Sequence, residues 1–171
     1  MRIRLDAIEF QDLAQLRVWR NDIMHDGYVR QWRYLNELDQ EDWLVRITRS
    51  NEHIMMKVLD ENDIMIGVVG LCYVDYIRRS GEVSIYIGDF DRRRMGYGKE
   101  ALTALLNYGF GTMNLHRIWG EIYIHNLSNI KLFEALKFKQ EGVLRDRHFF
   151  NGKYVDARIY SILEDEWPYT S

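Results

Sequence analysis

The chain has 171 residues, 47% of them hydrophobic and 29% charged, and these proportions fit one globular domain spanning residues 1–171. The net charge of −3 excludes a strong general attraction to nucleic acids or to anionic membranes, so we expect neither as a partner. A single cysteine excludes a framework of internal disulfides, and no apolar run has membrane-spanning length, so we expect a cytoplasmic location.

Periodic patterns in the first eighty residues predict both helices and strands. The order is a short strand at 3–5, a helix at 12–20, a helix after Asp39, and strands at 53–59 and 64–76. Asp39 is expected to cap the second helix, because a carboxylate there can accept the unpaired N–H groups of the first turn.

The second half of the chain alternates strands and helices. It predicts a strand at 81–88, a helix at 99–113, a strand at 116–124, a helix at 126–138 and a final hairpin with a type I′ turn at Asn151-Gly152. A helix connects the strands at 81–88 and 116–124, so these strands must lie parallel. We therefore expect a mixed α/β fold, with a mostly antiparallel central sheet, one parallel pair and helices on both faces.

The stretch DRRRMGYGKEAL, which begins at Asp91, places three arginines and two glycines directly before a predicted helix. A helix N-terminus offers unpaired N–H groups and a positive dipole end, and glycine lets an anion approach the backbone. Arg92, Arg93 and Arg94 add charge that suits phosphate. Glu100 excludes a P-loop and Ala101 excludes a dinucleotide fingerprint. The plainer interpretation is a solvated glycine turn.

Residues 93–98, RRMGYG, match the Arg/Gln-x-x-Gly-x-Gly/Ala signature of the GNAT superfamily, the acetyl-CoA-dependent N-acetyltransferases. Residues 81–167 as a whole resemble the branch that contains ribosomal-protein alanine acetyltransferases and spermidine acetyltransferases. The tail FFNGKYVDARIYSIL is especially similar to the spermidine enzymes. Residues 1–80 match the family in element order, with WRND at 19–22 as a weaker similarity.

The resemblance implies that acetyl-CoA is the co-substrate and binds where the two parallel strands splay apart. Strand backbone groups would pair with the pantetheine arm, the glycine loop would hold the pyrophosphate, and a later asparagine would reach the cofactor. Phe133 stands where relatives carry a tyrosine whose hydroxyl protonates the leaving thiolate, so any acid must be another residue or water. The implied cofactor-binding residues are Ile85, Tyr86, Ile87, Arg92, Arg93, Arg94, Met95, Gly96, Tyr97, Gly98, Lys99, Asn126, Asn129, Lys131 and Phe133.

Alternation along the strands indicates two candidate general bases. Glu82 shares a strand face with Ser84 and Tyr86, and a polar face on a mid-sheet strand indicates a cleft. Glu82 is the leading candidate to take a proton from the acceptor amine, directly or through water, and Glu121 is the second. The alternatives are a carboxylate near a strand end for Glu82 and a charge on a solvated face for Glu121. A strand N–H near Ile87 is the candidate oxyanion donor.

The expected acceptor is a primary amine of a small molecule, a polyamine such as spermidine or an amino sugar. Residues 25–39 are expected to shape its pocket, with Asp26, Glu37 and Asp39 attracting a cation. The alternatives are acetylation of a protein α-amine and an acetyl-CoA-binding regulatory module that has lost catalysis. The histidines show no metal-ligand spacing, Cys72 is expected in the core, and the resemblance implies a homo-oligomer, a dimer or larger.

Overall fold

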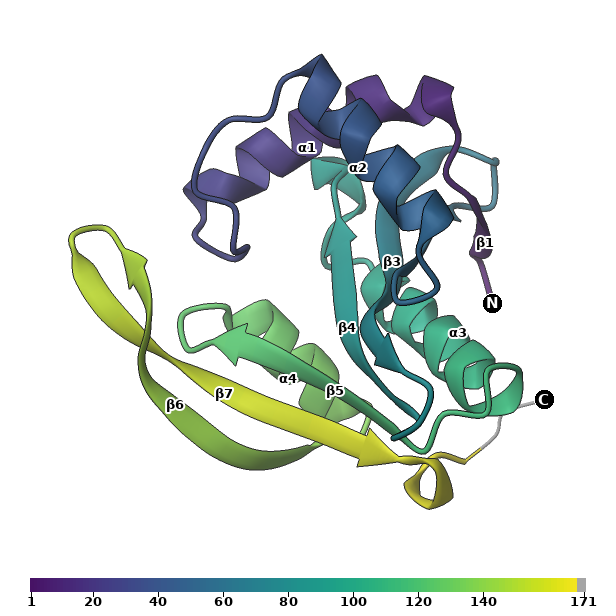
Figure 1. The fold of residues 1–171 in the computed structure, drawn as a ribbon, viewed down its shortest axis with the longest axis vertical. Helices are drawn as coiled ribbons and strands as arrows, with labels where there is room; N and C mark the ends of the chain where they lie inside the picture. Colours follow the sequence, from purple (N-terminus) through teal and green to yellow (C-terminus); the bar gives the residue numbers. More distant parts are fainter. Residues whose placement is uncertain (169–171) are drawn as a thin grey trace.

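The computed structural model describes residues 1–168 and contains a seven-stranded sheet with the strand order β1-β2-β3-β4-β5-β7-β6 (Figure 1). Neighbouring strands are antiparallel except β4 and β5, which are parallel, so the predicted mixed sheet is confirmed. The strands are β1 (Arg4–Ala7), β2 (Ile54–Leu59), β3 (Met65–Asp75), β4 (Ser80–Ile87), β5 (Arg117–Tyr123), β6 (Lys139–Phe150) and β7 (Lys153–Leu163).

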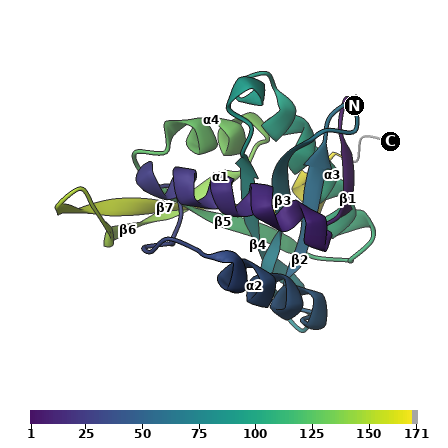
Figure 2. The same ribbon diagram turned by 90° about the horizontal axis from the view of Figure 1, so that it is seen from above.

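Helices cover both faces of the sheet, as predicted. They are α1 (Leu13–His25), α2 (Glu37–Arg49), α3 (Tyr97–Gly111) and α4 (Leu127–Ala135). The pair α1 and α2 lies on one face, and α3 and α4 lie on the other (Figure 2). None of the helices within residues 1–168 has the length and apolar character that a membrane crossing requires.

Two apolar layers hold the helices to the sheet. In α3, the fully buried Leu102 and Leu105 pack on one sheet face against Leu71 of β3. Burying one such leucine contributes about 1.5–3 kcal/mol. On the opposite face a smaller cluster around Leu16 and Trp19 anchors α1. The period-3.6 spacing of these residues in the sequence accounts for the contact faces of the helices.

The second helix begins earlier than predicted, and Asp39 is not its cap. Asn36 has extended backbone angles, and its side chain accepts the Asp39 N–H at 3.0 Å. In the reverse direction, the Asp39 carboxylate accepts a hydrogen bond from the Asn36 N–H at 3.0 Å. The pair forms a capping box, in which asparagine caps as well as aspartate and the third helical residue supplies the reciprocal acceptor.

The parallel strands separate soon after they meet. Their register covers Ser80 with Arg117, Gly81 with Ile118 and Glu82 with Trp119. Beyond these three residue pairs, β4 remains paired with β3 while β5 continues along β7. The two parallel strands therefore diverge, and a V-shaped gap opens between them (Figure 1). The splayed pair that the resemblance implies is thus present.

The β6–β7 hairpin extends toward the connection between α1 and α2 (Figure 1). Asn151 and Gly152 at its tip have φ values of 50° and 78°, which a type I′ turn requires, so this prediction is confirmed. Phe150 packs closely on Gly27 of the α1–α2 connection, since a Cβ on Gly27 would lie 2.3 Å from the ring. Hairpin and connection together border one side of the V.

Candidate active site

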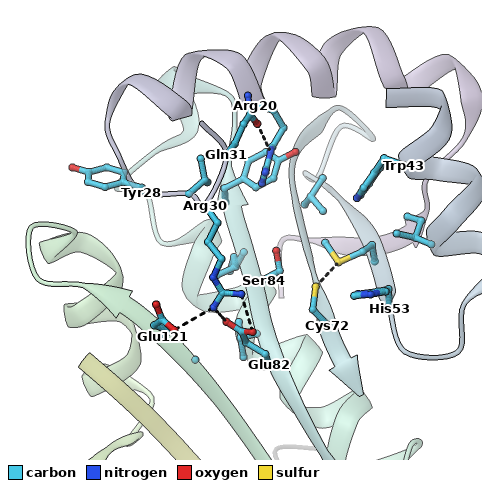
Figure 3. A pocket seen from close by; sticks show the side chains of 18 of the residues that line it. Arg20, Tyr28, Arg30, Gln31, Trp43, His53, Cys72, Glu82, Ser84 and Glu121 are labelled. Atoms are coloured by element: carbon cyan, nitrogen blue, oxygen red, sulfur yellow. Dashed lines mark hydrogen bonds and ion pairs between the residues drawn. The ribbon is translucent and has the colours of Figure 1, made fainter. Parts of the chain in front are cut away.

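A cavity of about 880 Å³ opens where β4 and β5 separate. Its lining comes from the α1–α2 connection, α2, β3, β4, β5 and α4, so segments far apart in sequence meet there (Figure 3). Both candidate bases line it, together with Ser84 and Tyr86 of β4. The polar strand face predicted from alternation therefore faces a cavity, as expected.

The two faces of β4 have different surroundings. Val83, Ile85 and Ile87 pack against the apolar layer under α3 and α4. Tyr86 packs in the opposite layer under α1, and burial raises the pKa of its phenol to about 12. This phenol therefore stays protonated at neutral pH.

Backbone hydrogen bonding along β4 also alternates. The N–H of Gly88 donates to the Ile66 carbonyl of β3 at 2.9 Å. In an antiparallel pair every second residue bonds across, so Tyr86 and Ser84 also direct their backbone groups toward β3. Tyr86, opposite Val68, belongs to that bonded set. The backbone groups of Ile85 and Ile87 point to the other side, where β5 has moved away. The prediction that Tyr86 also offers its backbone in the V is wrong for this reason.

Four charged side chains form a chain across the cavity. Arg30 of the α1–α2 connection holds Glu82 with two hydrogen bonds, of 2.5 Å from Nη2 and 3.2 Å from Nη1 (Figure 3). The same Nη2 lies 3.4 Å from Glu121, and Arg147 of β6 binds Glu121 at 2.9 and 3.1 Å. The Glu121 side chain is only 4% exposed, so the solvated-face interpretation is wrong. The hairpin and the connection cover it, which strand periodicity cannot reveal.

The electrostatics of this cluster follow from its burial. Burial lowers the pKa of Arg30, but the hydrogen bond and charge of Glu82, with the charge of Glu121, outweigh it and raise that pKa. Arg30 is thus held charged.

Burial also raises the pKa of Tyr123, which stacks on His148 with ring centroids 4.1 Å apart. The Tyr123 hydroxyl therefore stays protonated at neutral pH.

The three arginines of the glycine loop have separate environments. Arg92 pairs with the buried Asp60 at 2.9 Å, and Arg93 donates from Nε to the Ile87 carbonyl at 2.9 Å. Within residues 1–168, Arg94 has no ion-pair partner; it is exposed and has a φ of 62°. A left-handed φ is a conformation that glycine adopts readily and that other residues adopt at a cost. Arg94 is consequently the arginine of the three that is open to an anion.

The start of α3 forms an anion-binding geometry. Gly96 has a φ of 93° and precedes the first helical turn, whose leading N–H groups have no partner further back in the helix. A Cβ on Gly98 would lie 3.8 Å from Leu132 of α4 and 3.9 Å from Ile87, so Gly98 borders the V. Arg2 braces the loop by donating to the Met95 carbonyl at 3.0 Å. Lys99 is exposed at the same helix end.

Tyr97 is a packing residue. Its ring is buried, and its hydroxyl donates to Glu61 at 3.0 Å. The Arg2 guanidinium stacks over the ring at 4.5 Å. This side chain points away from the V, so it cannot replace the missing acid.

The implied residues of α4 divide into a cap, a lining pair and an exposed lysine. Asn126 is buried and caps the helix, since its side-chain carbonyl oxygen accepts the Asn129 N–H at 3.2 Å. Asn129 and Phe133 line the cavity, and Lys131 is exposed on the helix. Phe133 wedges against Gly120 of β5, where a Cβ would lie 2.7 Å from the ring.

The comparison with protein families decides the identity. The model described as "Acetyltransferase (GNAT) domain" matches residues 2–139, which is most of the chain. The chain belongs to the GNAT acetyltransferase family. This acetyltransferase therefore takes its acetyl group from acetyl-CoA and transfers it to an amine, and the predicted enzyme class is confirmed.

Curated and solved proteins agree with the family. The chain is 28% identical to a spermidine N(1)-acetyltransferase of Vibrio cholerae over 168 residues, which cover 97% of this chain and 95% of that one. A crystal structure of spermidine N-acetyltransferase from Vibrio cholerae in complex with CoA and spermine superposes with a TM-score of 0.91 and 27% identity, covering 96% and 97% of the two chains. A dodecameric structure of the Vibrio cholerae enzyme in an intermediate state gives 0.83 at 26% identity, covering 96% and 95%.

Several site residues of this acetyltransferase escaped prediction. Of the acidic residues expected at the pocket, Asp39 lines the cavity and pairs with Arg33 at 2.7 Å, whereas Glu37 pairs with Arg17 at 3.3 Å. Arg30 from the same segment, which was not predicted, also enters the cavity. Cys72 lines the cavity rather than the core, and burial followed by the Glu82 charge raises its pKa to about 11. Within residues 1–168, no group of three or more metal-ligating side chains is arranged around a possible ion.

Proposed function

We propose that this chain, acting as one domain over residues 1–171, acetylates a primary amine of a polyamine such as spermidine. The buried carboxylate pair Glu82 and Glu121 at the apex of the V carries the proposal, because cationic amines require such acceptors. Similarity over nearly the full length to a spermidine N(1)-acetyltransferase, and to a structure holding CoA and spermine, supports it.

The acetyl donor is proposed to lie in the V on the side of α3 and α4. The backbone groups of Ile85 and the N–H of Ile87, whose carbonyl already accepts from Arg93, suit the amide groups of a pantetheine arm, which would add like a strand. The N–H groups at Gly96 and Gly98 suit the pyrophosphate. The side chains proposed to complete this seat are Arg94, Lys99, Asn126, Asn129 and Lys131.

Glu82 is proposed as the general base. An alkyl ammonium has a pKa of about 10.4, so the amine must lose a proton before its nitrogen can attack the thioester carbon. Glu82 takes that proton directly or through water. The oxyanion forms close to Glu82, whereas Ile87 lies about 16 Å from Glu82 along the strand, so a backbone N–H of β4 nearer to Glu82 is the proposed donor in place of Ile87. As the C–S bond breaks, the nitrogen gives up its second proton, which reaches the thiolate, so the amide and the thiol form while Glu82 keeps the first proton.

The thiolate needs little help to leave. A thiol has a pKa of about 8.5, so the thiolate is an acceptable leaving group near neutral pH. Phe133 cannot supply a proton, and Tyr123, which lines the cavity with a protonated hydroxyl, is the proposed donor in its place.

An amino sugar is the second candidate acceptor. Arg30 and Arg147 balance the charges of Glu82 and Glu121, and a charge-balanced cavity favours an acceptor with several hydroxyl groups. Trp43 and Tyr86 in the lining supply faces that a sugar ring can contact.

Thiol release from acetyl-CoA, measured across polyamines, amino sugars and peptides with free N-termini, tests these proposals. We expect the largest kcat/KM with spermidine or spermine. Preference for an amino sugar supports the second candidate, and preference for peptides supports a protein α-amine acceptor. Release with none of them, alongside a rise in melting temperature with acetyl-CoA, establishes a binding module.

We also propose that this enzyme works as a homo-oligomer in the cytoplasm. The dodecameric Vibrio cholerae structure supports assembly, and the single cysteine supports the location. Light scattering after size-exclusion chromatography measures the mass directly. A monomer at micromolar concentration contradicts the first part.

A further inference from the structure

Arg30 occupies the place where a cationic acceptor would bind. Its Nη2 contacts both carboxylates, at 2.5 Å from Glu82 and 3.4 Å from Glu121 (Figure 3). An ammonium group carries three N–H donors and can make the same two contacts. The two cations cannot be present together, because both need the space between the carboxylates.

Hydrogen bonds hold the chain on either side of Arg30. The Gln31 side chain donates from Nε2 to Asn21 of α1 at 3.0 Å, and the Leu35 N–H donates to the same Asn21 oxygen at 2.8 Å. On the other side, His125 Nε2 donates to the Gly27 carbonyl at 3.1 Å. These contacts attach the α1–α2 connection to α1 and to the end of β5.

The Arg30 side chain is less restrained than its backbone. It is 45% exposed, whereas the Glu82 side chain is 9% exposed. An arginine has a long flexible stem, so its guanidinium can turn into water without movement of the connection. Glu121 keeps a second cation, Arg147, after Arg30 has left. Glu82 has no such second partner among residues 1–168.

The two arginine hydrogen bonds occupy one lone pair on each oxygen of Glu82, and an amine or a water that approaches from the cavity must compete with them. We infer that Arg30 is a displaceable counter-ion of the acceptor site, which restrains Glu82 until a cationic acceptor replaces it. This inference rests on the proposed function, since it assigns Glu82 as the base. Arg30 is a positioning and specificity-determining residue in this scheme.

Two consequences follow for the reaction. Without an acceptor, a free Glu82 can take a proton from water, whose oxygen then attacks the thioester carbon. The C–S bond breaks, acetic acid forms, and the proton on Glu82 passes to the thiolate, so acetyl-CoA is lost to hydrolysis. Arg30 suppresses this reaction by holding Glu82.

The second consequence concerns selectivity. The nitrogen that attacks must be neutral, so a monoamine leaves no cation to replace Arg30 at the carboxylates. A polyamine keeps a second ammonium that can stay beside Glu121 while the first nitrogen reacts. Arg30 therefore favours acceptors with at least two amino groups.

The test uses the full chain with Arg30→Gln, which keeps polar contacts and removes the charge. Thiol release from acetyl-CoA is measured without acceptor, with spermidine and with butylamine. We expect acceptor-free hydrolysis to rise on the order of tenfold, a small part of the roughly 10²–10⁴ that a positioned general base contributes. The preference for spermidine over butylamine in kcat/KM should fall by about the same factor through a gain for butylamine.

Two further variants make the test decisive. Arg4→Gln is the matched control, because Arg4 bridges Asp6 at 2.7 Å and Asp63 at 2.8 Å on the exposed strand β1, away from the cavity. It should change neither readout. Arg30→Lys keeps the charge and loses the two-pronged contact, so its hydrolysis should lie between wild type and Arg30→Gln. If Arg30→Gln does not fold, the hydrolysis rate of Arg30→Lys tests the role of Arg30 in its place.

The outcomes separate this inference from the proposed function. Unchanged hydrolysis and unchanged preference in Arg30→Gln, while wild type acetylates spermidine, overturn the role of Arg30 alone. Raised hydrolysis in Arg30→Gln, with no polyamine acetylated by wild type, supports the role of Arg30 and overturns the acceptor class. Failure of both readouts overturns both.

Discussion

Replacement of Glu82 by glutamine tests the proposed base most directly. Glutamine has nearly the same shape and keeps one oxygen to accept from Arg30, but it cannot take a proton. A positioned general base contributes roughly 10²–10⁴ in rate, and we expect kcat to fall within that range. Glu121 cannot substitute, because Arg147 holds it at 2.9 and 3.1 Å.

The fold should survive this replacement. The Arg30 side chain is 45% exposed, so its charge can turn into water and no unpaired charge stays buried. Loss of the Glu82 charge also removes its desolvation penalty, so the net change in unfolding free energy should stay within about 1 kcal/mol. For a chain of this length, 1 kcal/mol corresponds to a change in melting temperature of about 2–4 °C. A large loss of kcat with a nearly unchanged melting temperature is therefore the expected signature.

The assay is steady-state thiol release with saturating acetyl-CoA and varied spermidine, at several pH values. Glu82→Gln should regain rate as the pH approaches about 10.4, where the amine loses its proton unaided. Glu121→Gln is the matched comparison and should raise KM more than it lowers kcat. A kcat in Glu82→Gln within about threefold of wild type, or a larger kcat loss in Glu121→Gln, refutes the assignment of the base.

Three other changes follow from the packing. Gly98→Ala should weaken acetyl-CoA binding about tenfold, measured by calorimetry, because the added Cβ faces Ile87 and Leu132 at the V. Alanine forms helices better than glycine, so the same change should add up to about 1 kcal/mol to the free energy of unfolding. An unchanged affinity contradicts the proposed acetyl-CoA site. Gly88→Ala should lower the free energy of unfolding, measured with denaturant, by about 1–3 kcal/mol, since its Cβ would lie 2.0 Å from Trp19. Gly142→Ala is the control and should leave this free energy unchanged, because the space around Gly142 is open. Equal effects of the two changes contradict the packing described for Gly88. Cys72 should react with a disulfide reagent at pH 8 about 100-fold more slowly in the native than in the unfolded chain. The reason is that a thiol pKa raised from 9.0 to about 11 leaves little thiolate at that pH. Similar rates in the two states contradict the burial of Cys72.

The order of elements could be predicted from the sequence because each element carries its own period. The stripe of leucines in α3 and the alternation in β4 are local signals, and the helix between β4 and β5 forces their parallel direction. Boundaries were less certain: the cap moved from Asp39 to Asn36, because both residue types suit a helix start three positions apart. The glycine loop was located correctly, since its signal lies within a few residues.

The partners of the charged residues could not be predicted. Arg30 and Glu82 are 52 positions apart, and Arg147 and Glu121 are 26 apart, so no local pattern links them. Alternation shows which face of β5 carries Glu121 but not that the hairpin and the α1–α2 connection cover it. For the same reason the sequence predicted three arginines available to a phosphate group, whereas Asp60 and the Ile87 carbonyl bind two of them.

On the proposed assignment, the base lies where the parallel strands part. Glu82 and Trp119 are the last paired residues of β4 and β5, and the next backbone groups of β4 face the open V. The donor can then approach from the side of α3 and α4, and the acceptor from the side of α1 and α2, so the two substrates meet only near Glu82. Phe133 of α4 packs against Gly120 of β5, where a Cβ would lie 2.7 Å from the ring, and against Tyr160 of β7. That packing uses the ring and no hydroxyl, so a phenylalanine supports β5 at the edge of the V without supplying an acid.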